Sequence, residues 1–458
     1  MVLHSQLDLG LNANQQRAVE TTAGPLLVLA GAGTGKTRVI TARIARLIRS
    51  GIAAAQILAI TFTRKAAAEM NDRTRAILGQ RAWGITVTTF HAFGFRILRE
   101  QRASTGQGGT IRVLSEFEQQ QLVRAAAAAA SSNEDIDRLR TAISRAKNAG
   151  MTPADLQSRA ANDSQAAIAA AYRSYQEELA AASAIDLDDM VIQPLEILES
   201  SPAIRQACQK RWTHLLIDEY QDTSQGQDRL VTCLLNAERN VCVVGDDDQS
   251  IYSFRGADVE RIRSFAGRVA GTRTIKLETN YRSCSPIIDL ANAVINGAAH
   301  RTAKRLVSQV GGGPPVEWAI VSDPTAEFQY LTRRIQESAA SVSYSSIAVL
   351  VRLRRHVSIL TRELRQAGIP CSNESGADGV VVMTLHQAKG LEFPVVFLPL
   401  LEDGVFPYHR ATPGTEEHEE ERRLLYVGIT RARRRLFLSC AANRHTSPSP
   451  FLLDGPSG

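Results

Sequence analysis

The glycine-rich stretch AGAGTGKT, from Ala30 to Thr37, limits the possible folds of this chain more than any other feature. An apolar run from Leu26 to Leu29 precedes it and predicts a buried β-strand. Apolar side chains then recur at helical spacing between Arg38 and Ile48. A strand, a glycine-rich turn and a helix, in this order, are the setting that a phosphate-binding loop requires.

A loop of this kind can bind a nucleoside triphosphate. Its backbone N–H groups converge on phosphate oxygens, and the helix N-terminus adds a partial positive charge. The Lys36 amine could reach the β- and γ-phosphates, and the Thr37 hydroxyl could coordinate Mg²⁺. The alternative is a chance Lys-Thr pair after a glycine-rich turn, which the agreement of strand, loop and helix disfavours. The candidate nucleotide contacts here are Ala30, Gly31, Ala32, Gly33, Thr34, Gly35, Lys36, Thr37 and Arg38.

The composition bounds the class of protein. A chain of 458 residues is long enough for about two to four domains. Lysine and arginine total 53 against 47 acidic residues, a net charge of +6 that fits a polyanionic partner and, on charge alone, a solvated basic surface equally well. Six scattered cysteines indicate neither a zinc site nor a disulfide framework. No apolar run reaches membrane-spanning length and no signal peptide is present, so we expect a cytoplasmic protein without a membrane partner.

A second apolar strand, beginning at His214, ends in two adjacent carboxylates. Asp218 would hold Mg²⁺ directly or through water, and Glu219 would orient or deprotonate the attacking water. Such a pair is unremarkable alone. Together with Lys36 and Thr37 it predicts a site that hydrolyses ATP.

Four more residues are candidates for the nucleotide. Gln15, just upstream of the loop, could read the adenine edge, although a glutamine on a helix is usually solvated. Gln249 follows a strand that begins at Val241 and could touch the γ-phosphate. Tyr281 could stack on adenine, and Arg282 could reach the γ-phosphate as an arginine finger.

Aromatic side chains beside basic ones suggest contacts with single-stranded bases. Phe62 ends a predicted strand next to Thr63, and a core position beside a helix cap explains this pair equally well. His91 has no second metal ligand nearby, which favours a hydrogen-bonding or nucleic-acid contact. A further group that suits base stacking is Tyr252, Phe254 and Arg255. A position in the core would explain Tyr252 alone equally well.

The chain between and after these motifs changes character. Alanine-rich helical segments from Phe93 to Ile204 predict an all-helical insertion. Its acidic cluster is interpreted as a helix cap and polar loop rather than a metal site: Asp186, Asp188 and Asp189. A second α/β region has its first clear strand at Ile347–Val351, and Ser372–Gly379 is a short polar turn before the next strand. The acidic run Glu416–Glu421 is interpreted as the solvated start of a helix.

Taken in order, nine stretches between residues 11 and 440 identify a family. They are LNANQ, AGAGTGKT, ITFTRKAAAEM, TTFHAFG, LLIDEYQDTS, VVGDDDQSIYSFRGAD, LETNYRS, VVMTLHQAKGLEFPVVFL and EEERRLLYVGITRARRRL. A phosphate loop alone is generic, whereas the ordered set is highly specific. With these stretches the chain resembles the UvrD/Rep/PcrA-type superfamily 1 DNA helicases.

The resemblance implies an α/β fold with two RecA-like P-loop domains, each with a parallel sheet, ATP in the cleft between them and single-stranded DNA across the top of both. The first RecA-like ATPase domain would comprise residues 1–92 and 205–281, and the second residues 282–458. An all-helical insertion subdomain would occupy residues 93–204. Arginines from the opposite domain would then couple hydrolysis to domain motion and stepping.

The resemblance also implies a role for each matching residue. Adenine would contact Gln15 and Tyr281. Hydrolysis would depend on Lys36, Thr37, Asp218 and Glu219. The γ-phosphate would be sensed by Gln249, Arg282 and Arg431. The nucleotide, at its ribose, would also contact Glu392. The DNA path would be lined by Phe62, His91, Tyr252, Phe254 and His386.

The chain departs from the family pattern in three places. The phosphate loop opens with Ala30 instead of glycine, and alanine is small enough for that position. Phe254 stands where the family usually has tryptophan, which keeps a stacking face but reduces its area. Relatives carry a large helical domain just before the strand at Val380, where this chain has only the eight residues Ser372–Gly379. That domain contacts duplex DNA and restrains unwinding in the family, so its absence puts duplex unwinding in question.

We therefore expect an ATP-dependent 3′–5′ DNA helicase and single-stranded DNA translocase that uses ATP and Mg²⁺. The alternative is a translocase with DNA-stimulated ATPase activity that does not unwind duplex by itself and acts with a partner. A binding module with a vestigial ATPase is disfavoured because Lys36, Asp218, Glu219, Arg282 and Arg431 are all present. The expected partners are single-stranded DNA, junctions of single- and double-stranded DNA, and a repair or replication protein at the nucleoid.

Overall fold

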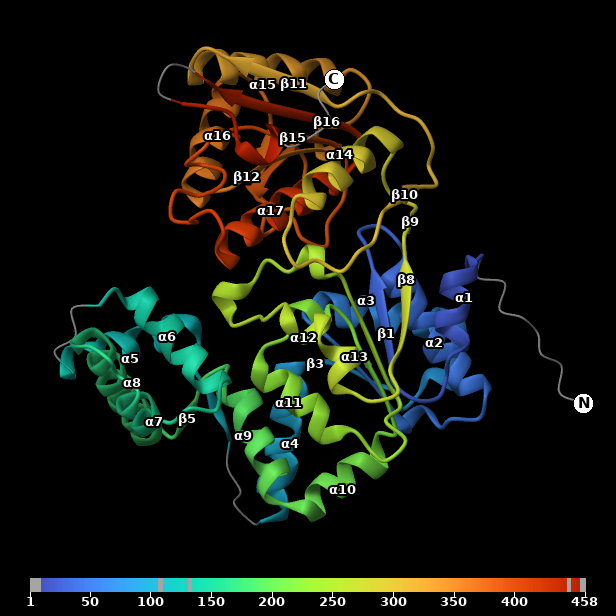
Figure 1. The fold of residues 1–458 in the computed structure, drawn as a ribbon, viewed down its shortest axis with the longest axis vertical. Coiled ribbons are helices and arrows are strands. Elements are labelled where there is room, and N and C mark those ends of the chain that lie inside the picture. Colours follow the sequence, from blue (N-terminus) through green and yellow to red (C-terminus); the bar gives the residue numbers. More distant parts are fainter. Residues whose placement is uncertain (1–9, 106–109, 131–133, 443–445, 454–458) are drawn as a thin grey trace, which may run out of the picture. The chain divides into compact units, whose positions relative to one another are not determined.

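Two six-stranded sheets organise this computed structural model, which describes residues 10–105, 110–130, 134–442 and 446–453 (Figure 1). The described chain divides into two units, and each contains one of these sheets. The first unit runs to Leu29, from Lys36 to Gly245 and from Tyr252 to Ile275. The second unit comprises Ala30–Gly35, Asp246–Ile251 and the chain from Lys276 onward.

The first sheet has the strand order β3-β2-β6-β7-β1-β8, and its neighbours from β3 to β1 pair in parallel. Its strands are β1 (Leu26–Ala30), β2 (Ile57–Thr61), β3 (Thr86–Thr89), β6 (His214–Ile217), β7 (Val241–Gly245) and β8 (Arg273–Leu277). The surrounding helices are α1 (Ala13–Glu20), α2 (Lys36–Arg49), α3 (Arg64–Leu78), α4 (Phe90–Ser104), α9 (Asp189–Ser200), α10 (Pro202–Arg211), α11 (Gln225–Leu234), α12 (Glu260–Arg263) and α13 (Phe265–Arg268). The predicted phosphate loop thus lies between β1 and α2, as the sequence indicates.

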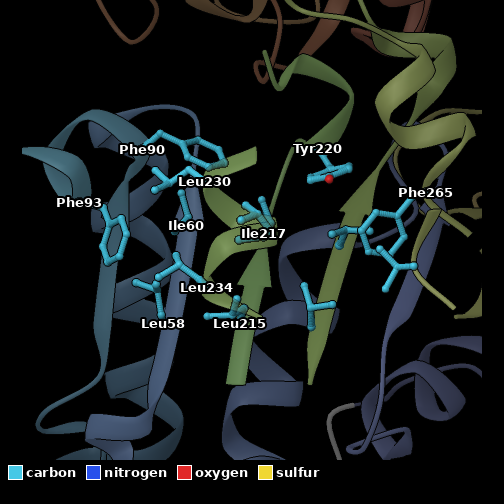
Figure 2. Close-up of a cluster of buried hydrophobic side chains, with 14 of the residues drawn as sticks. Leu58, Ile60, Phe90, Phe93, Leu215, Ile217, Tyr220, Leu230, Leu234 and Phe265 are labelled. Atoms are coloured by element: carbon cyan, nitrogen blue, oxygen red, sulfur yellow. The ribbon is translucent and has the colours of Figure 1, made fainter. Parts of the chain in front are cut away.

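One hydrophobic core holds this sheet against its helices (Figure 2). Alternate strand residues such as Leu58, Ile60 and Ile217 are fully buried against side chains of α4, α9 and α11. The Phe93 ring packs edge-on against Trp212, with ring centroids 5.1 Å apart. Because the strands from β3 to β1 pair in parallel, their carboxyl ends lie at one edge of the sheet.

The helical insertion has its own core. Its elements are β4 (Arg112–Val113), α5 (Glu116–Ala129), α6 (Ile136–Asn148), α7 (Pro153–Ser158), α8 (Asp163–Ala181) and β5 (Ala184–Ile185). The helices α5 and α8 begin at Glu116 and Asp163, ahead of the alanine-rich parts of their sequences. Ser115 and Asn162 cap these two helices, and each side chain accepts a hydrogen bond from the first turn. Polar caps therefore set the helix starts, while the alanine periodicity predicts only the helix bodies.

Two of the three aspartates in the acidic cluster of the insertion, Asp186 and Asp189, are buried, which corrects the interpretation as a polar loop. The Lys147 Nζ lies 2.7 Å from Asp186 Oδ2 and 2.9 Å from Asp189 Oδ1, with all three side chains buried. Asp186 also accepts a hydrogen bond from the Asp189 N–H, as a capping residue does. Burial lowers the pKa of Lys147, but the two carboxylates outweigh it and raise the pKa above its ordinary value. The cluster is an ion-paired core element.

The second sheet has the order β11-β16-β15-β12-β14-β13, and all of its neighbours pair in parallel. Its strands are β11 (Glu317–Val321), β12 (Ile347–Val351), β13 (Cys371–Ser372), β14 (Val380–Thr384), β15 (Phe393–Leu398) and β16 (Ala432–Ala441). A separate parallel pair joins β9 (Thr279–Asn280) and β10 (Val307–Ser308). The helices of this unit are α14 (Ser285–Asn296), α15 (Pro324–Ala339), α16 (Arg354–Gln366), α17 (Glu416–Ile429) and α18 (Pro450–Leu453).

The connection between β13 and β14 is a short turn of residues 373–379. Gly379 has φ +115°, and a Cβ atom at this position would lie 2.8 Å from the carbonyl carbon of Pro370. The turn therefore requires glycine at its last residue, for conformation and for space.

The helix α17 corrects another prediction. Glu420 and Glu421 are buried rather than solvated. The Arg352 guanidinium makes a paired contact with Glu421, with the shortest N–O distance 2.7 Å.

Among the residues that the structure describes, no helix is long and apolar enough to cross a membrane.

The packing of α4 on α9 predicts a strong effect of one methyl group. A Cβ atom at Gly94 would lie 1.8 Å from the Met190 carbonyl oxygen. We expect Gly94→Ala to lower the free energy of unfolding by about 1–3 kcal/mol, because one helix must shift. Gly267→Ala, whose Cβ atom meets nothing within 4 Å, should change it by less than about 0.5 kcal/mol. Urea unfolding of both variants checks this, and equal stabilities would contradict the close approach of the two helices at Gly94.

Candidate nucleotide and nucleic-acid site

The phosphate loop closes on itself through Thr34. Its hydroxyl donates to the Gly31 carbonyl oxygen at 2.8 Å. Gly33 and Gly35 have φ values of +65° and +86°, in the left-handed region that favours glycine. Ala30 and Ala32 are fully buried, so small side chains suit both positions. The loop thus has the compact glycine-dependent conformation that the sequence predicts.

Asn280, at the end of β9, supports this loop. Its Nδ2 donates to the Ala32 carbonyl oxygen at 2.7 Å, and its Oδ1 accepts from the N–H groups of Arg282 and Ser283 at 2.9 and 2.8 Å. The adjacent Tyr281 N–H donates to the Gly33 carbonyl oxygen at 2.9 Å, while the Tyr281 ring is partly exposed. Tyr281 and Arg282 are candidates from the sequence, whereas Asn280, which fixes the loop through its backbone, is not apparent there.

Asp218 lies directly after β6, and its side chain is buried. Burial, and then the charge of Glu219, raise the pKa of Asp218 to about 7, while the Lys36 charge acts in the opposite direction. Glu219 has φ +51°, a strained conformation for a residue with a side chain. Its Oε2 accepts a hydrogen bond of 2.6 Å from Gln221 Nε2, and Gln221 is itself fully buried. Gln221, like Asn280, is not apparent as a functional residue from the sequence.

These residues fit a divalent cation bound with phosphate. A buried carboxylate beside another carboxylate is short of positive charge, and a Mg²⁺ ion would favour its ionised form. Carboxylate and hydroxyl oxygens are suitable ligands for this hard cation. Asp218 and Thr37 supply such oxygens, and Lys36 begins α2 beside Thr37.

Gln15 is not a solvated helix residue. It is fully buried, and its side chain accepts a hydrogen bond of 3.0 Å from the Asn12 N–H. The Asn12 side chain accepts in return from the Gln15 N–H, which makes a capping box at the start of α1. The side chain of Gln15 therefore has a fixed place, while its contact with adenine stays a prediction. Arg38, in the first turn of α2, is exposed.

Two candidate arginines contact Thr430 in the second unit. Arg282 Nε is 2.6 Å from Glu392 Oε2, and its Nη1 donates to the Thr430 carbonyl oxygen at 3.2 Å. The Arg431 side chain is buried and donates to the carbonyl oxygens of Val427 and Leu391 at 2.9 and 3.1 Å. The structure thus brings together Arg282, Glu392 and Arg431, and it fixes both guanidinium groups.

Gln249 lies in a buried turn after β7. Its Nε2 donates to Asp246 Oδ2 at 2.5 Å, and its backbone N–H donates to the Asp246 carbonyl oxygen at 2.9 Å. The Gln249 carbonyl oxygen accepts from Lys389 Nζ at 2.6 Å. Arg423 Nε donates to the next carbonyl oxygen, that of Ser250, at 2.7 Å. Side chains far along the chain therefore hold this turn, and sequence spacing carries no signal for them.

Four of the candidate DNA contacts form one aromatic and basic cluster. The Phe62 and Tyr252 rings stack, with centroids 5.5 Å apart and planes 13° from parallel. The Phe254 ring packs edge-on against Tyr252 and is 47% exposed. The Arg255 guanidinium lies over the Tyr252 and Phe254 rings, 5.5 and 5.8 Å from their centroids. The exposed face of this cluster suits the stacking of bases.

The remaining candidates differ in their surroundings. Thr63 caps α3 and accepts a hydrogen bond of 3.1 Å from the Ala66 N–H, so the helix-cap interpretation is confirmed. Burial, and then the nearby Arg64 charge, lower the pKa of His91, which favours the neutral form of its imidazole. His386 follows β14 in the second unit and is half-buried. Their contacts with DNA stay predictions.

Comparison with known families matches both parts of the chain. The UvrD/REP helicase N-terminal domain matches residues 11–270. The UvrD-like helicase C-terminal domain matches in two parts, residues 275–376 and 371–443. The two parts meet at the short turn between β13 and β14.

Individual relatives agree with these matches. The ATP-dependent DNA helicase PcrA of Leuconostoc citreum is 29% identical over 95% of this chain and 82% of its own length. The ATP-dependent DNA helicase UvrD1 of Mycobacterium tuberculosis is 30% identical over 98% of this chain and 84% of its own length. The PcrA of Staphylococcus epidermidis is 36% identical over 80% of this chain, which spans only 51% of that relative. The first two alignments extend over 616 and 650 positions, so these relatives contain segments without a counterpart in the 458 residues here.

The geometry of the phosphate loop predicts that Gly33 is indispensable. An alanine there must adopt a left-handed conformation, which costs about 1–2 kcal/mol, and its Cβ atom would lie 2.5 Å from Asn280 Nδ2. We expect Gly33→Ala to weaken the binding of a fluorescent ATP analogue more than about tenfold.

Gly24→Ala is the matched control. Gly24 also has a positive φ, of +75°, but a Cβ atom there meets nothing within 4 Å. This variant should lose stability without losing nucleotide affinity, as measured by thermal unfolding and by the same titration. Unchanged affinity in Gly33→Ala would show that the loop does not hold the nucleotide.

Proposed function

Because the chain belongs to the UvrD/Rep helicase family, we propose that it is an ATP-dependent DNA helicase that moves 3′ to 5′ along single-stranded DNA and couples ATP hydrolysis to strand separation. The observation that carries this proposal is the buried Asp218 carboxylate after β6, with the Glu219 charge beside it and Lys36 close enough to oppose the rise in the pKa of Asp218. The direction of movement rests on the family resemblance.

The hydrolysis step in this proposal uses residues of the first unit. Lys36 binds the β- and γ-phosphates, and Thr37 and Asp218 hold Mg²⁺, which neutralises charge on the phosphate oxygens when bound. Glu219 orients the attacking water and accepts its proton. The hydrogen bond from Gln221 to Glu219 supports this role, because it fixes the carboxylate at one oxygen.

The adenine and ribose contacts are Gln15, Tyr281 and Glu392 in this proposal. The γ-phosphate contacts are Gln249, Arg282 and Arg431. Their support is preorganisation, since Arg282 is held by Glu392 and Thr430, and Arg431 by two backbone carbonyl oxygens. Fixed cationic groups stabilise the charge that develops in the transition state without first having to reorganise.

Single-stranded DNA follows the cluster of Phe62, Tyr252, Phe254 and Arg255, and also contacts Thr63, His91 and His386. Stacked aromatic rings accept any base, because every base presents a π-face. An Arg255 guanidinium beside the rings adds attraction to the DNA backbone. The protein would then act in the cytoplasm, at the nucleoid.

A second candidate function is translocation without unwinding. The observation that favours it is the short turn of residues 373–379, where the family resemblance places a helical domain that contacts duplex DNA. In this case the protein has DNA-stimulated ATPase activity and moves along single-stranded DNA. A repair or replication protein at the junction would separate the strands.

One experiment separates these functions. The purified chain is mixed with ATP, Mg²⁺ and a fluorescent duplex that carries a 3′ or a 5′ single-stranded tail, and ATP hydrolysis is measured in parallel. We expect DNA-stimulated hydrolysis and displacement from the 3′-tailed duplex alone. Hydrolysis without displacement supports the translocase, and displacement only from the 5′-tailed duplex refutes the proposed polarity.

Lys36→Ala is the control for this experiment. It removes the amine that binds the phosphates and should abolish hydrolysis while single-stranded DNA is still bound. Hydrolysis that persists in this variant would show that the phosphate loop is not the active site.

The exposed ring of Phe254 gives a separate prediction for DNA binding. Loss of one stacking contact costs about 1–3 kcal/mol, so Phe254→Ala should weaken binding to single-stranded DNA about 5- to 150-fold. Phe254→Trp restores the larger ring of the family and should tighten binding. Trp83→Ala removes another exposed aromatic ring, outside the cluster, and should leave DNA affinity unchanged in the same anisotropy titration. Equal losses in Phe254→Ala and Trp83→Ala would exclude a specific stacking contact.

A further inference from the structure

Three consecutive buried aspartates follow β7, and they belong to the second unit. Asp246, Asp247 and Asp248 are at most 2% exposed. One carboxylate oxygen from each lies within 4.8 Å of the others, as in a metal site. In the part of the chain that the structure describes, no other acidic, histidine or cysteine side chains converge in this way.

A lysine fills the position that a metal ion would take. Lys304 Nζ lies 2.9 Å from Asp246 Oδ1, 2.5 Å from Asp247 Oδ1 and 2.7 Å from Asp248 Oδ2, and its side chain is 1% exposed. Arg301 adds a paired contact with Asp248, at 2.7 and 3.1 Å. Burial opposes the charge of Lys304, but the three carboxylates outweigh it and raise the pKa of this amine far above its ordinary value. The cluster therefore has no room for a divalent cation, because the Lys304 ammonium group occupies that position.

Each of the first two aspartates uses its second oxygen differently. Asp246 Oδ2 accepts the hydrogen bond of 2.5 Å from Gln249 Nε2. Asp247 Oδ2 accepts a hydrogen bond of 2.8 Å from the Thr302 N–H. Lys304 is thus connected through one carboxylate to the side-chain amide of Gln249, and through the other to its own backbone segment.

This connection fixes the direction of the Gln249 amide. A side-chain amide can rotate so that its oxygen and nitrogen exchange places. A fixed hydrogen-bond acceptor removes this ambiguity, because the amide nitrogen must then face the acceptor. Asp246 is such an acceptor, and the contact with Lys304 holds its carboxylate. The charged side chains of this network are largely shielded from salt, since Arg301, the most accessible of them, is 13% exposed.

We propose that Lys304 is a positioning residue of the ATPase, which holds Asp246 so that Gln249 presents a fixed amide to the γ-phosphate. This inference rests on the proposed function, because it assumes that Gln249 contacts the nucleotide. Lys304 itself touches neither nucleotide nor magnesium in this mechanism. It acts through the Asp246 carboxylate, which contacts Lys304 with one oxygen and Gln249 with the other.

A matched pair of variants tests the proposal. In Asp246→Asn the side chain can accept with only one atom, so it cannot serve both Lys304 and Gln249. In Asp247→Asn the same change breaks a contact with Lys304 or with Thr302 but leaves the bond to Gln249 intact. Both residues are fully buried, and both carboxylates contact Lys304, so their effects on stability should be similar.

The readout is steady-state ATP hydrolysis with saturating single-stranded DNA. A misplaced catalytic contact can cost about 10²-fold, so Asp246→Asn and Lys304→Met should lower kcat by roughly this factor, while KM for ATP changes less than about threefold. Asp247→Asn should keep kcat within about twofold of the unmodified chain. Equal losses of kcat in the two aspartate variants, or an unchanged kcat in folded Lys304→Met, would overturn the proposal.

Two further measurements keep this test decisive. If Lys304→Met does not fold, the double variant Lys304→Met/Asp247→Asn, which removes one charge of each sign, takes its place with the same expected loss of kcat. Hydrogen–deuterium exchange of the peptide that covers residues 246–251 needs no enzymatic activity. Exchange should be faster in Lys304→Met than in Asp247→Asn, and equal exchange would refute the positioning role even if the chain hydrolysed no ATP. Absence of hydrolysis in the unmodified chain would refute only the proposed function.

Discussion

A buried carboxylate is stable in its charged form only beside a positive charge. The protein satisfies this requirement in two different ways at the ends of two neighbouring strands, and the rest of the structure depends on these two arrangements. Asp218 follows β6, and Asp246, Asp247 and Asp248 follow β7, its parallel neighbour in the first sheet. At Asp218, burial and then the Glu219 charge outweigh the opposing Lys36 charge, so the pKa of this carboxyl is raised. Around the three aspartates after β7, Lys304 and Arg301 supply two positive charges in direct contact. The first arrangement can take up a cation with the nucleotide, whereas in the second the Lys304 amine already lies among the three carboxylates.

This difference explains what can be predicted from the sequence. A carboxylate after an apolar strand is visible in the sequence, and so is a glycine-rich loop between a strand and a helix. The strand Ile347–Val351 is predicted with its correct bounds, because a continuous apolar run marks a strand buried on both faces. The partner of a buried charge is not visible, because it depends on the tertiary fold. Lys304 for Asp246, Lys147 for Asp186 and Arg352 for Glu421 are all distant in the chain.

Local rules fail for the same reason at both acidic runs. The cluster Asp186–Asp189 and the run Glu416–Glu421 contain consecutive charges, which on average indicate solvated segments. In each case the chain buries some of the charges beside a basic residue from another helix or strand end.

The aromatic residues also acquire their meaning only from the tertiary fold. Phe62 and Tyr252 are each ambiguous alone, and their stacked rings next to Arg255 make one surface that neither residue predicts by itself.

The second unit also shows which parts of the machinery depend on one another. Asn280, Arg282, Glu392 and Arg431 make their contacts with the phosphate loop and with backbone around Thr430, and none of these contacts involves the turn of residues 373–379. That turn is specific in itself, because Gly379 must be glycine beside Pro370. The groups proposed to act on ATP are therefore complete in a chain with this short connection. A segment inserted at the turn lies outside these contacts, so the proposed hydrolysis does not depend on it and strand separation has to be tested separately.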